Sequence, residues 1–132
     1  MANLLIVDDD ADFAGAAAKV LQAAGHRVGV ELETGAALAR MEQTPPDLVV
    51  LDVMFPEDDA AGFELARHMR REGGPLAQVP ILMLTAINIK FPLGFGSQDI
   101  DDIWLPVDDF LEKPVDLDAL QQKVTAMLAA PP

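Results

Sequence analysis

Short, continuously apolar runs alternate along this chain with longer stretches that carry helical periodicity. The runs at 4–7, 48–51 and 81–84 contain no polar residue, which is typical of strands that are covered on both faces of a sheet. Between these runs, apolar residues recur at intervals of three and four, which indicates amphipathic helices. Such alternation predicts a parallel sheet with helices on both faces and right-handed crossovers. The chain is therefore restricted to the α/β class.

Turn and cap residues divide the chain into the expected elements. Gly25 is suited to end the first helix, and Thr34 is a candidate N-cap for the second, which stops before Pro45 and Pro46. Strands are expected at 4–7, 26–30, 48–51, 81–84 and 109–112. Helices are expected over roughly 11–24, 34–41 and 61–72 and from near Asp116, with the three arginines of the third helix, at positions 67, 70 and 71, facing outward.

Residues 87–107 interrupt this rhythm. The segment contains two prolines and two glycines, so its fourth helix is expected to be shortened or atypical. Four large apolar side chains make a plain solvated loop a poor interpretation: Phe91, Phe95, Trp104 and Leu105. Two interpretations stay open, since these side chains either pack down in place of the helix or form an exposed surface for a partner.

The amino-acid composition narrows the class of protein and its expected cellular compartment. With 51% apolar and 23% charged residues, the 132 residues are expected to form one globular domain over 1–132. A net charge of −13 argues against binding to nucleic acid or to an anionic membrane surface. Residues 1–7 carry no basic residue and no apolar run reaches membrane-spanning length, so a cytoplasmic location is expected. The absence of cysteine excludes disulfides and thiolate chemistry.

Reactive side chains follow the predicted strands where each strand ends. Asp8 and Asp9 follow the first strand, Asp52 the third, Thr85 the fourth and Lys113 the fifth. The carboxyl ends of parallel strands meet at one edge of the sheet, where ligands bind in open α/β folds. Carboxylates gathered there repel one another and need a cation, and hard oxygen ligands favour Mg²⁺.

Four motifs in this order resemble the receiver domain of bacterial response regulators. They are Leu5-Ile6-Val7-Asp8-Asp9-Asp10, Asp52-Val53-Met54-Phe55-Pro56, Leu84-Thr85-Ala86 and Phe110-Leu111-Glu112-Lys113-Pro114. The resemblance covers nearly the whole chain. It implies a three-layer, doubly wound, five-stranded parallel sheet of flavodoxin-like order 2-1-3-4-5. It also implies a phosphorylation-controlled interaction switch of a two-component system, with no output domain in this chain.

The resemblance assigns the acceptor and the metal ligands. Asp52 is expected to accept a phosphoryl group from a histidine kinase, a histidine phosphotransfer protein or a small acyl phosphate. Asp9, Asp52 and the backbone carbonyl of Met54 are expected to bind Mg²⁺ directly, and Asp8 through a water molecule. The protein is then a regulatory phosphoacceptor with Mg²⁺-dependent self-phosphorylation, and is not an enzyme in the usual sense.

Further positions carry over from the same family. Lys113 and Thr85 are expected to contact phosphoryl oxygens, with the backbone amide of Ala86 as a third donor. Phe110 and Thr85 are the expected switch pair, and Pro114 is expected to follow a cis peptide bond that orients the lysine.

Two apolar positions, Met54 and Ile87, are expected to govern the lifetime of the acyl phosphate. Neither side chain can orient an attacking water, which predicts slow self-dephosphorylation. The downstream protein is unknown from the sequence, and homodimerisation stays open.

Plainer roles remain open for several of these residues. Asp8 or Asp9 could cap the first helix, and Thr85 could be an ordinary residue at a strand end. Phe110 could be a fixed core residue. His26 and His68 are expected to be surface residues.

Three alternatives to the receiver function concern the same residues. A haloacid-dehalogenase-type phosphatase has a second aspartate two residues after its nucleophile, where this chain has Met54. A flavin-binding protein needs a Ser/Thr/Gly-rich loop after the first strand, where three aspartates stand instead. A receiver-like scaffold that is never switched is the third rival, because of the unusual segment at 87–107.

Overall fold

The computed structural model describes residues 2–52, 61–72, 74–86, 109–113 and 115–129. Its centre is one sheet in which every pairing between neighbouring strands is parallel, in the order β2-β1-β3-β4-β5. The strands are β1 (Asn3–Val7), β2 (Arg27–Glu31), β3 (Leu48–Asp52), β4 (Ile81–Ala86) and β5 (Asp109–Lys113). The prediction of an α/β fold with a parallel sheet is confirmed.

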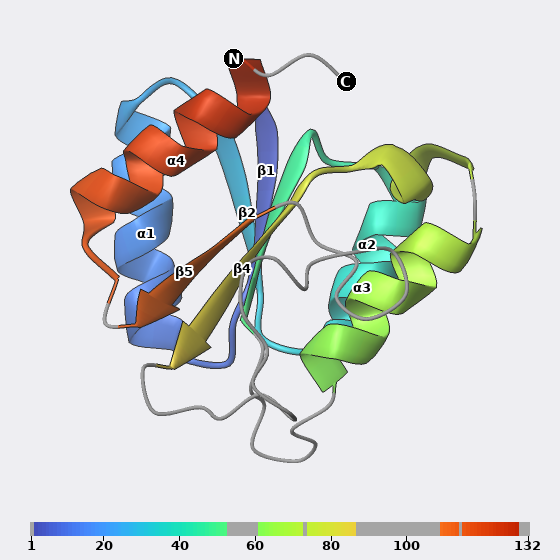
Figure 1. Ribbon diagram of the computed structural model, residues 1–132. Coiled ribbons are helices and arrows are strands. Elements are labelled where there is room, and N and C mark those ends of the chain that lie inside the picture. Colours follow the sequence, from blue (N-terminus) through green and yellow to red (C-terminus); the bar gives the residue numbers. More distant parts are fainter. Residues whose placement is uncertain (1, 53–60, 73, 87–108, 114, 130–132) are drawn as a thin grey trace.

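Helices cover both faces of the sheet, as Figure 1 shows. Helices α1 (Ala11–Ala23) and α4 (Leu117–Ala129) lie on one face and contact each other. Helices α2 (Thr34–Gln43) and α3 (Ala61–Glu72) lie on the other face, and the short 3₁₀ helix η1 (Gly74–Gln78) follows α3. The expected shortened fourth helix, between β4 and β5, falls outside the described residues.

The core forms two apolar layers, one on each side of the sheet. Because side chains alternate along a strand, Val49 and Leu51 of β3 pack under α2 and α3, whereas Leu48 and Val50 pack under α1 and α4. All five residues of β3 are buried, which explains its uninterrupted apolar sequence up to Asp52. The rigid sheet thus holds the last residue of β3 in a fixed place at its carboxyl edge.

Local details support some of the expected element ends and correct others. Gly25 adopts a φ of 99° just after α1, a conformation that favours glycine over any residue with a side chain. Thr34 is the first residue of α2 and Glu33 occupies the N-cap position, so the Thr34 cap is wrong.

Arg70 also departs from its expected outward placement. Its Nη1 donates hydrogen bonds to the carbonyl oxygens of Ala77 (3.1 Å) and Val79 (2.8 Å), which joins α3 to the segment that leads into β4. On the other face, Lys123 of α4 forms an ion pair of 2.9 Å with Asp109 at the start of β5. Among the described residues, no helix is long and apolar enough to cross a membrane.

Candidate functional site

Strand pairing places the acidic residues side by side at the carboxyl edge of the sheet. Val7, the last residue of β1, pairs with Leu51 of β3, so the next residues along, Asp8 and Asp52, emerge from neighbouring strands. Figure 1 shows that the central strands all end at this edge, which lies at the bottom of that view. The aspartates that follow the first strand therefore lie beside Asp52, as the sequence predicted.

The three carboxylates form a compact cluster. Asp8, Asp9 and Asp52 each offer one oxygen, and these oxygens all lie within 4.8 Å of one another. Asp8 is fully buried and Asp52 is 4% exposed, whereas Asp9 is exposed. Two carboxyl groups are thus removed from water close to each other, an arrangement that is unfavourable unless a cation or hydrogen bonds compensate.

The donor set fits a hard divalent cation. All three side chains supply oxygen, and no other described residue adds a sulfur or nitrogen ligand to the cluster. Mg²⁺ is bound in proteins by one or two carboxylates together with water and phosphate oxygens. One buried and one exposed carboxylate beside Asp52 leave an open side for such ligands, so the residues fit the Mg²⁺ that the sequence predicted.

The turn that carries the first-strand aspartates is held by hydrogen bonds of the chain itself. Asp8 Oδ1 accepts a hydrogen bond of 2.9 Å from the backbone N–H of Asp10, and the Asp8 N–H donates to the Glu31 carbonyl at 3.1 Å. Asp10 then caps α1, because its Oδ1 accepts from the N–H of Phe13 at 3.1 Å. The alternative that Asp8 or Asp9 caps this helix is wrong, since Asp10 has that role.

Replacing Asp10 by alanine tests how this turn is built. We expect Asp10→Ala to lower the free energy of unfolding by about 0.5–2 kcal/mol, because a backbone N–H in the first turn of α1 loses its partner. Urea unfolding of both proteins measures the difference. Asp12→Ala, an exposed acidic residue in the same first turn, is the matched control and should cost less. Equal losses in the two variants would contradict the capping role.

Backbone register brings the other predicted residues to the same edge. Asp52 of β3 pairs with Leu84 of β4, and Thr85 is the residue that follows Leu84. Ala86, the last residue of β4, pairs with Lys113 at the end of β5. Phe110 pairs with Met83, farther from the edge. These strand positions are described, whereas the side chains concerned, and the whole of Met54, Ile87 and Pro114, lie outside the described residues.

The two histidines are only partly exposed. His26 Nδ1 accepts a hydrogen bond of 3.3 Å from the backbone N–H of Ala2, and His68 lies on α3. The prediction that both histidines are surface residues is thus correct only in part, because each is partly buried. Sequence reasoning also missed Asp10, although a cap is recognisable from an aspartate just before a helix that begins at Ala11.

Comparisons with known proteins bear directly on this arrangement. The family model described as "Response regulator receiver domain" matches residues 4–125. The transcriptional regulatory protein AfsQ1 of Streptomyces coelicolor is 34% identical over 128 residues, which are 97% of this chain and 52% of that protein. Protein PilH of Pseudomonas aeruginosa is 29% identical, and the match covers 98% of this chain and 99% of PilH. The chain spans about half the length of the transcriptional regulators that it matches.

Solved structures share the fold. A CheY-like response regulator receiver domain protein from Methanospirillum hungatei superimposes with a TM-score of 0.76 at 29% identity, covering 96% of this chain and 93% of the other. A two-component response regulator from Clostridium difficile gives a TM-score of 0.77 at 26% identity, covering 97% and 96%. The arrangement of strands and helices is thus the flavodoxin-like one that the resemblance implied.

Proposed function

Because the chain belongs to the family of response regulator receiver domains, we propose that Asp52 is the phosphoryl acceptor of a two-component signalling system. The observation that carries this proposal is the cluster in which oxygens of Asp8, Asp9 and Asp52 lie within 4.8 Å of one another at the carboxyl edge. Asp52 is the member that the central strand β3 holds in place, which suits a nucleophile that must be positioned accurately.

The proposed reaction is an in-line displacement. A carboxylate oxygen of Asp52 attacks phosphorus, the bond from phosphorus to the donor's histidine nitrogen or acyl oxygen breaks, and the donor leaves with the bonding electrons. Asp9 and Asp52, with the Met54 carbonyl, would hold Mg²⁺, and Asp8 would act through a metal-bound water. When bound, the ion neutralises negative charge on the transferring group. The chain itself supplies positioning and charge.

The remaining family residues would contact the phosphoryl group or respond to it. Lys113 would contact a phosphoryl oxygen as a compact positive charge, and Thr85 and the Ala86 amide would donate hydrogen bonds to the others. Phe110 would move into the space that Thr85 leaves, with a cis bond before Pro114 fixing the position of the lysine. The positions of Thr85 and Ala86 at the end of β4, and of Lys113 at the end of β5, support this proposal.

Incubation with acetyl phosphate tests the proposed function. The chain is expected to gain the mass of one phosphoryl group in the presence of Mg²⁺ and none in EDTA, as measured by intact-protein mass spectrometry. The Mg²⁺ requirement follows from the need to neutralise three clustered acids before an anionic donor can approach. Equal labelling with and without Mg²⁺ would contradict the proposed site.

Self-dephosphorylation is expected to be slow, on the scale of many minutes. Met54 and Ile87 have apolar side chains, and neither can orient a water molecule for attack on the acyl phosphate. Removing the donor and following the phosphorylated mass over time measures the lifetime. Loss of the phosphoryl group within a few seconds, with no phosphatase present, would contradict this prediction.

We further propose that residues 1–132 form one receiver that works in the cytoplasm as an interaction switch. Its donor would be a histidine kinase or a histidine phosphotransfer protein, and its downstream target another protein rather than nucleic acid. The alternative of a scaffold that is never switched makes a different prediction, namely no phosphorylation from acetyl phosphate under any metal condition.

A further inference from the structure

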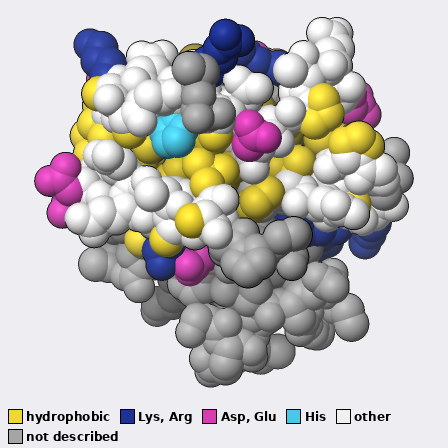
Figure 2. Space-filling view, turned by 90° about the horizontal axis from the view of Figure 1, so that it is seen from above, with side chains coloured by type: hydrophobic (Ala, Val, Ile, Leu, Met, Phe, Trp, Pro, Cys, Tyr) yellow, Lys and Arg dark blue, Asp and Glu magenta, His cyan; other side chains and the backbone are white. Residues whose placement is uncertain are grey.

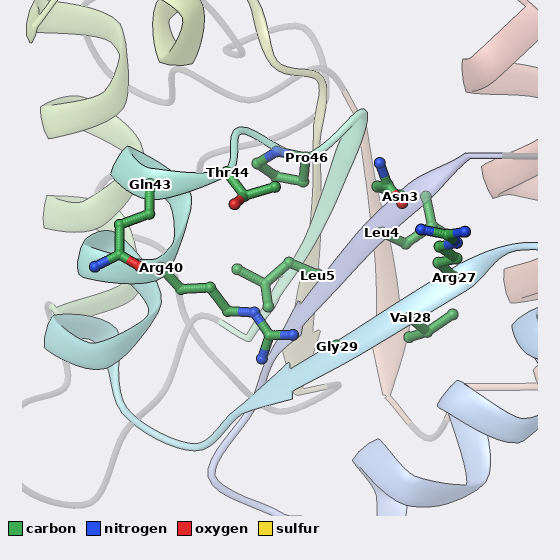
Figure 3. A pocket seen from close by; sticks show the side chains of 10 residues that line it. All are labelled: Asn3, Leu4, Leu5, Arg27, Val28, Gly29, Arg40, Gln43, Thr44 and Pro46. Carbon is green, nitrogen blue, oxygen red and sulfur yellow. The ribbon is translucent and has the colours of Figure 1, made fainter.

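A cavity of about 390 Å³ opens between α2 and the amino-terminal half of β1 and β2. Its lining comes from β1, β2, the last turns of α2 and the segment that follows α2, as Figure 3 shows. The acidic cluster lies at the opposite, carboxyl edge of the sheet. Figure 2 looks onto the amino-terminal edge, where the visible acidic side chains are few and separated from one another. This cavity is therefore distinct from the proposed phosphorylation site.

The charge of the lining is opposite to the charge of the chain. The protein has 22 acidic and nine Lys or Arg residues, yet the described residues that line the cavity include two arginines, Arg27 and Arg40, and no aspartate or glutamate. Asn3, Gln43 and Thr44 add uncharged hydrogen-bonding groups, with Leu5 among the apolar ones. A lining of this kind favours an anion over a cation or an apolar ligand.

The guanidinium of Arg40 lies over Gly29, where no side chain occupies the space. A Cβ atom at Gly29 would come within 2.6 Å of Arg40 Cζ, so only glycine leaves room for the guanidinium in this position. Nη1 of Arg40 forms an ion pair of 3.1 Å with Glu31, which does not line the cavity. Within the described residues, this is the only ion pair of Arg40. A planar guanidinium can bind a second carboxylate or phosphate through its other N–H groups.

Arg27 lies on the same face of β2. Residues 27 and 29 are two apart on the strand, so their side chains point to the same side. Arg27 is exposed, and among the described residues it has no ion-pair partner. The two guanidinium groups come from different elements, Arg27 from β2 and Arg40 from α2. Figure 3 shows the Arg40 guanidinium near Gly29 and that of Arg27 farther toward the start of β2.

We propose that this cavity binds a small molecule that carries two or more anionic groups, such as a polycarboxylate or a polyphosphate. One anionic group would pair with Arg40 and the other with Arg27, and the amide and hydroxyl groups of the lining would orient the ligand between them. The cavity volume lies near the lower end of the roughly 300–1,000 Å³ that is usual for small-molecule sites. The inference does not depend on phosphorylation of Asp52.

A titration followed by ¹H–¹⁵N NMR spectra tests the proposal with three probes: citrate, pyrophosphate and the monoanion acetate. Citrate or pyrophosphate is expected to cause saturable shifts of the amide signals of β2 and α2, whereas acetate and NaCl at equal ionic strength are not. Comparing the affinities for citrate and for pyrophosphate distinguishes a site for carboxylates from a site for phosphates. Shifts that do not saturate with either of these probes, or that NaCl reproduces, would overturn the proposal.

Five variants separate binding at this site from general charge effects. Arg27→Gln and Arg40→Gln are each expected to weaken binding about tenfold or more, whereas Arg71→Gln, the same charge change on the exposed end of α3, is not. Gly29→Ala keeps the net charge but displaces the Arg40 guanidinium, and is expected to weaken binding as well. Asp52→Asn should bind normally. Binding that is equal in the wild type and in both pocket arginine variants would overturn the proposal.

Discussion

Asp52→Asn is expected to abolish phosphorylation by acetyl phosphate completely. An amide oxygen is a far weaker nucleophile than a carboxylate and forms no stable acyl phosphate, and Asp52 is the only member of the described cluster that is itself part of a strand, the last residue of β3. The measurement is the mass of the intact protein after incubation with acetyl phosphate and Mg²⁺. Asp118→Asn, the same substitution at an exposed position on α4, is the matched control and should be labelled like the wild type.

The fold of Asp52→Asn must be checked separately. In EDTA its thermal midpoint is expected to equal or exceed that of the wild type, because one of three mutually repelling carboxylates has lost its charge. A lower midpoint would mean that loss of labelling reflects unfolding. Full labelling of Asp52→Asn would show that another residue accepts the phosphoryl group.

Leu82→Ala is expected to have the largest effect on stability. Leu82 is fully buried on the interior strand β4, in the apolar layer beneath α1 and α4. Removing most of its side chain leaves a cavity that the packed sheet cannot close, with a loss of about 2–5 kcal/mol in the free energy of unfolding. Denaturant unfolding measures this loss as a lower midpoint at nearly unchanged slope.

Leu32 provides the matched control for this substitution. It is 43% exposed, the only large hydrophobic side chain so exposed among the described residues. Leu32→Ala should therefore cost much less than Leu82→Ala, since less apolar surface is returned to water. Similar losses at the two positions would contradict the assignment of Leu82 to the core.

The fold was predictable because its clearest sequence pattern, the buried apolar runs, also reflects the strongest physical requirement, the burial of apolar side chains. Leu48 to Leu51 must be covered on both faces, and a buried run of this kind between helical segments leads directly to a parallel α/β sheet. The meeting of Asp8 and Asp52 follows from the same topology, since parallel strands expose their carboxyl ends at one edge.

The features that the sequence did not reveal depend on tertiary geometry or on single hydrogen bonds. Residue type alone could not separate Asp10 from Asp8 and Asp9, because all three aspartates are suitable caps and the choice among them depends on the exact residue at which the helix begins. Arg70 looked like a solvated helix residue, yet it bonds to carbonyls that follow it by seven and nine positions. The Arg40–Gly29 contact joins a helix to a strand and leaves no local pattern.

A crystal structure of the protein with Mg²⁺ and beryllofluoride would show most directly whether Asp52 is the phosphoryl acceptor. We expect a divalent ion among the carboxylates of Asp8, Asp9 and Asp52, at the roughly 2.0–2.1 Å from its directly bound oxygens that Mg²⁺ requires, with beryllium bonded to an Asp52 oxygen. An ion bound elsewhere, or a beryllofluoride group on any other carboxylate, would contradict this expectation.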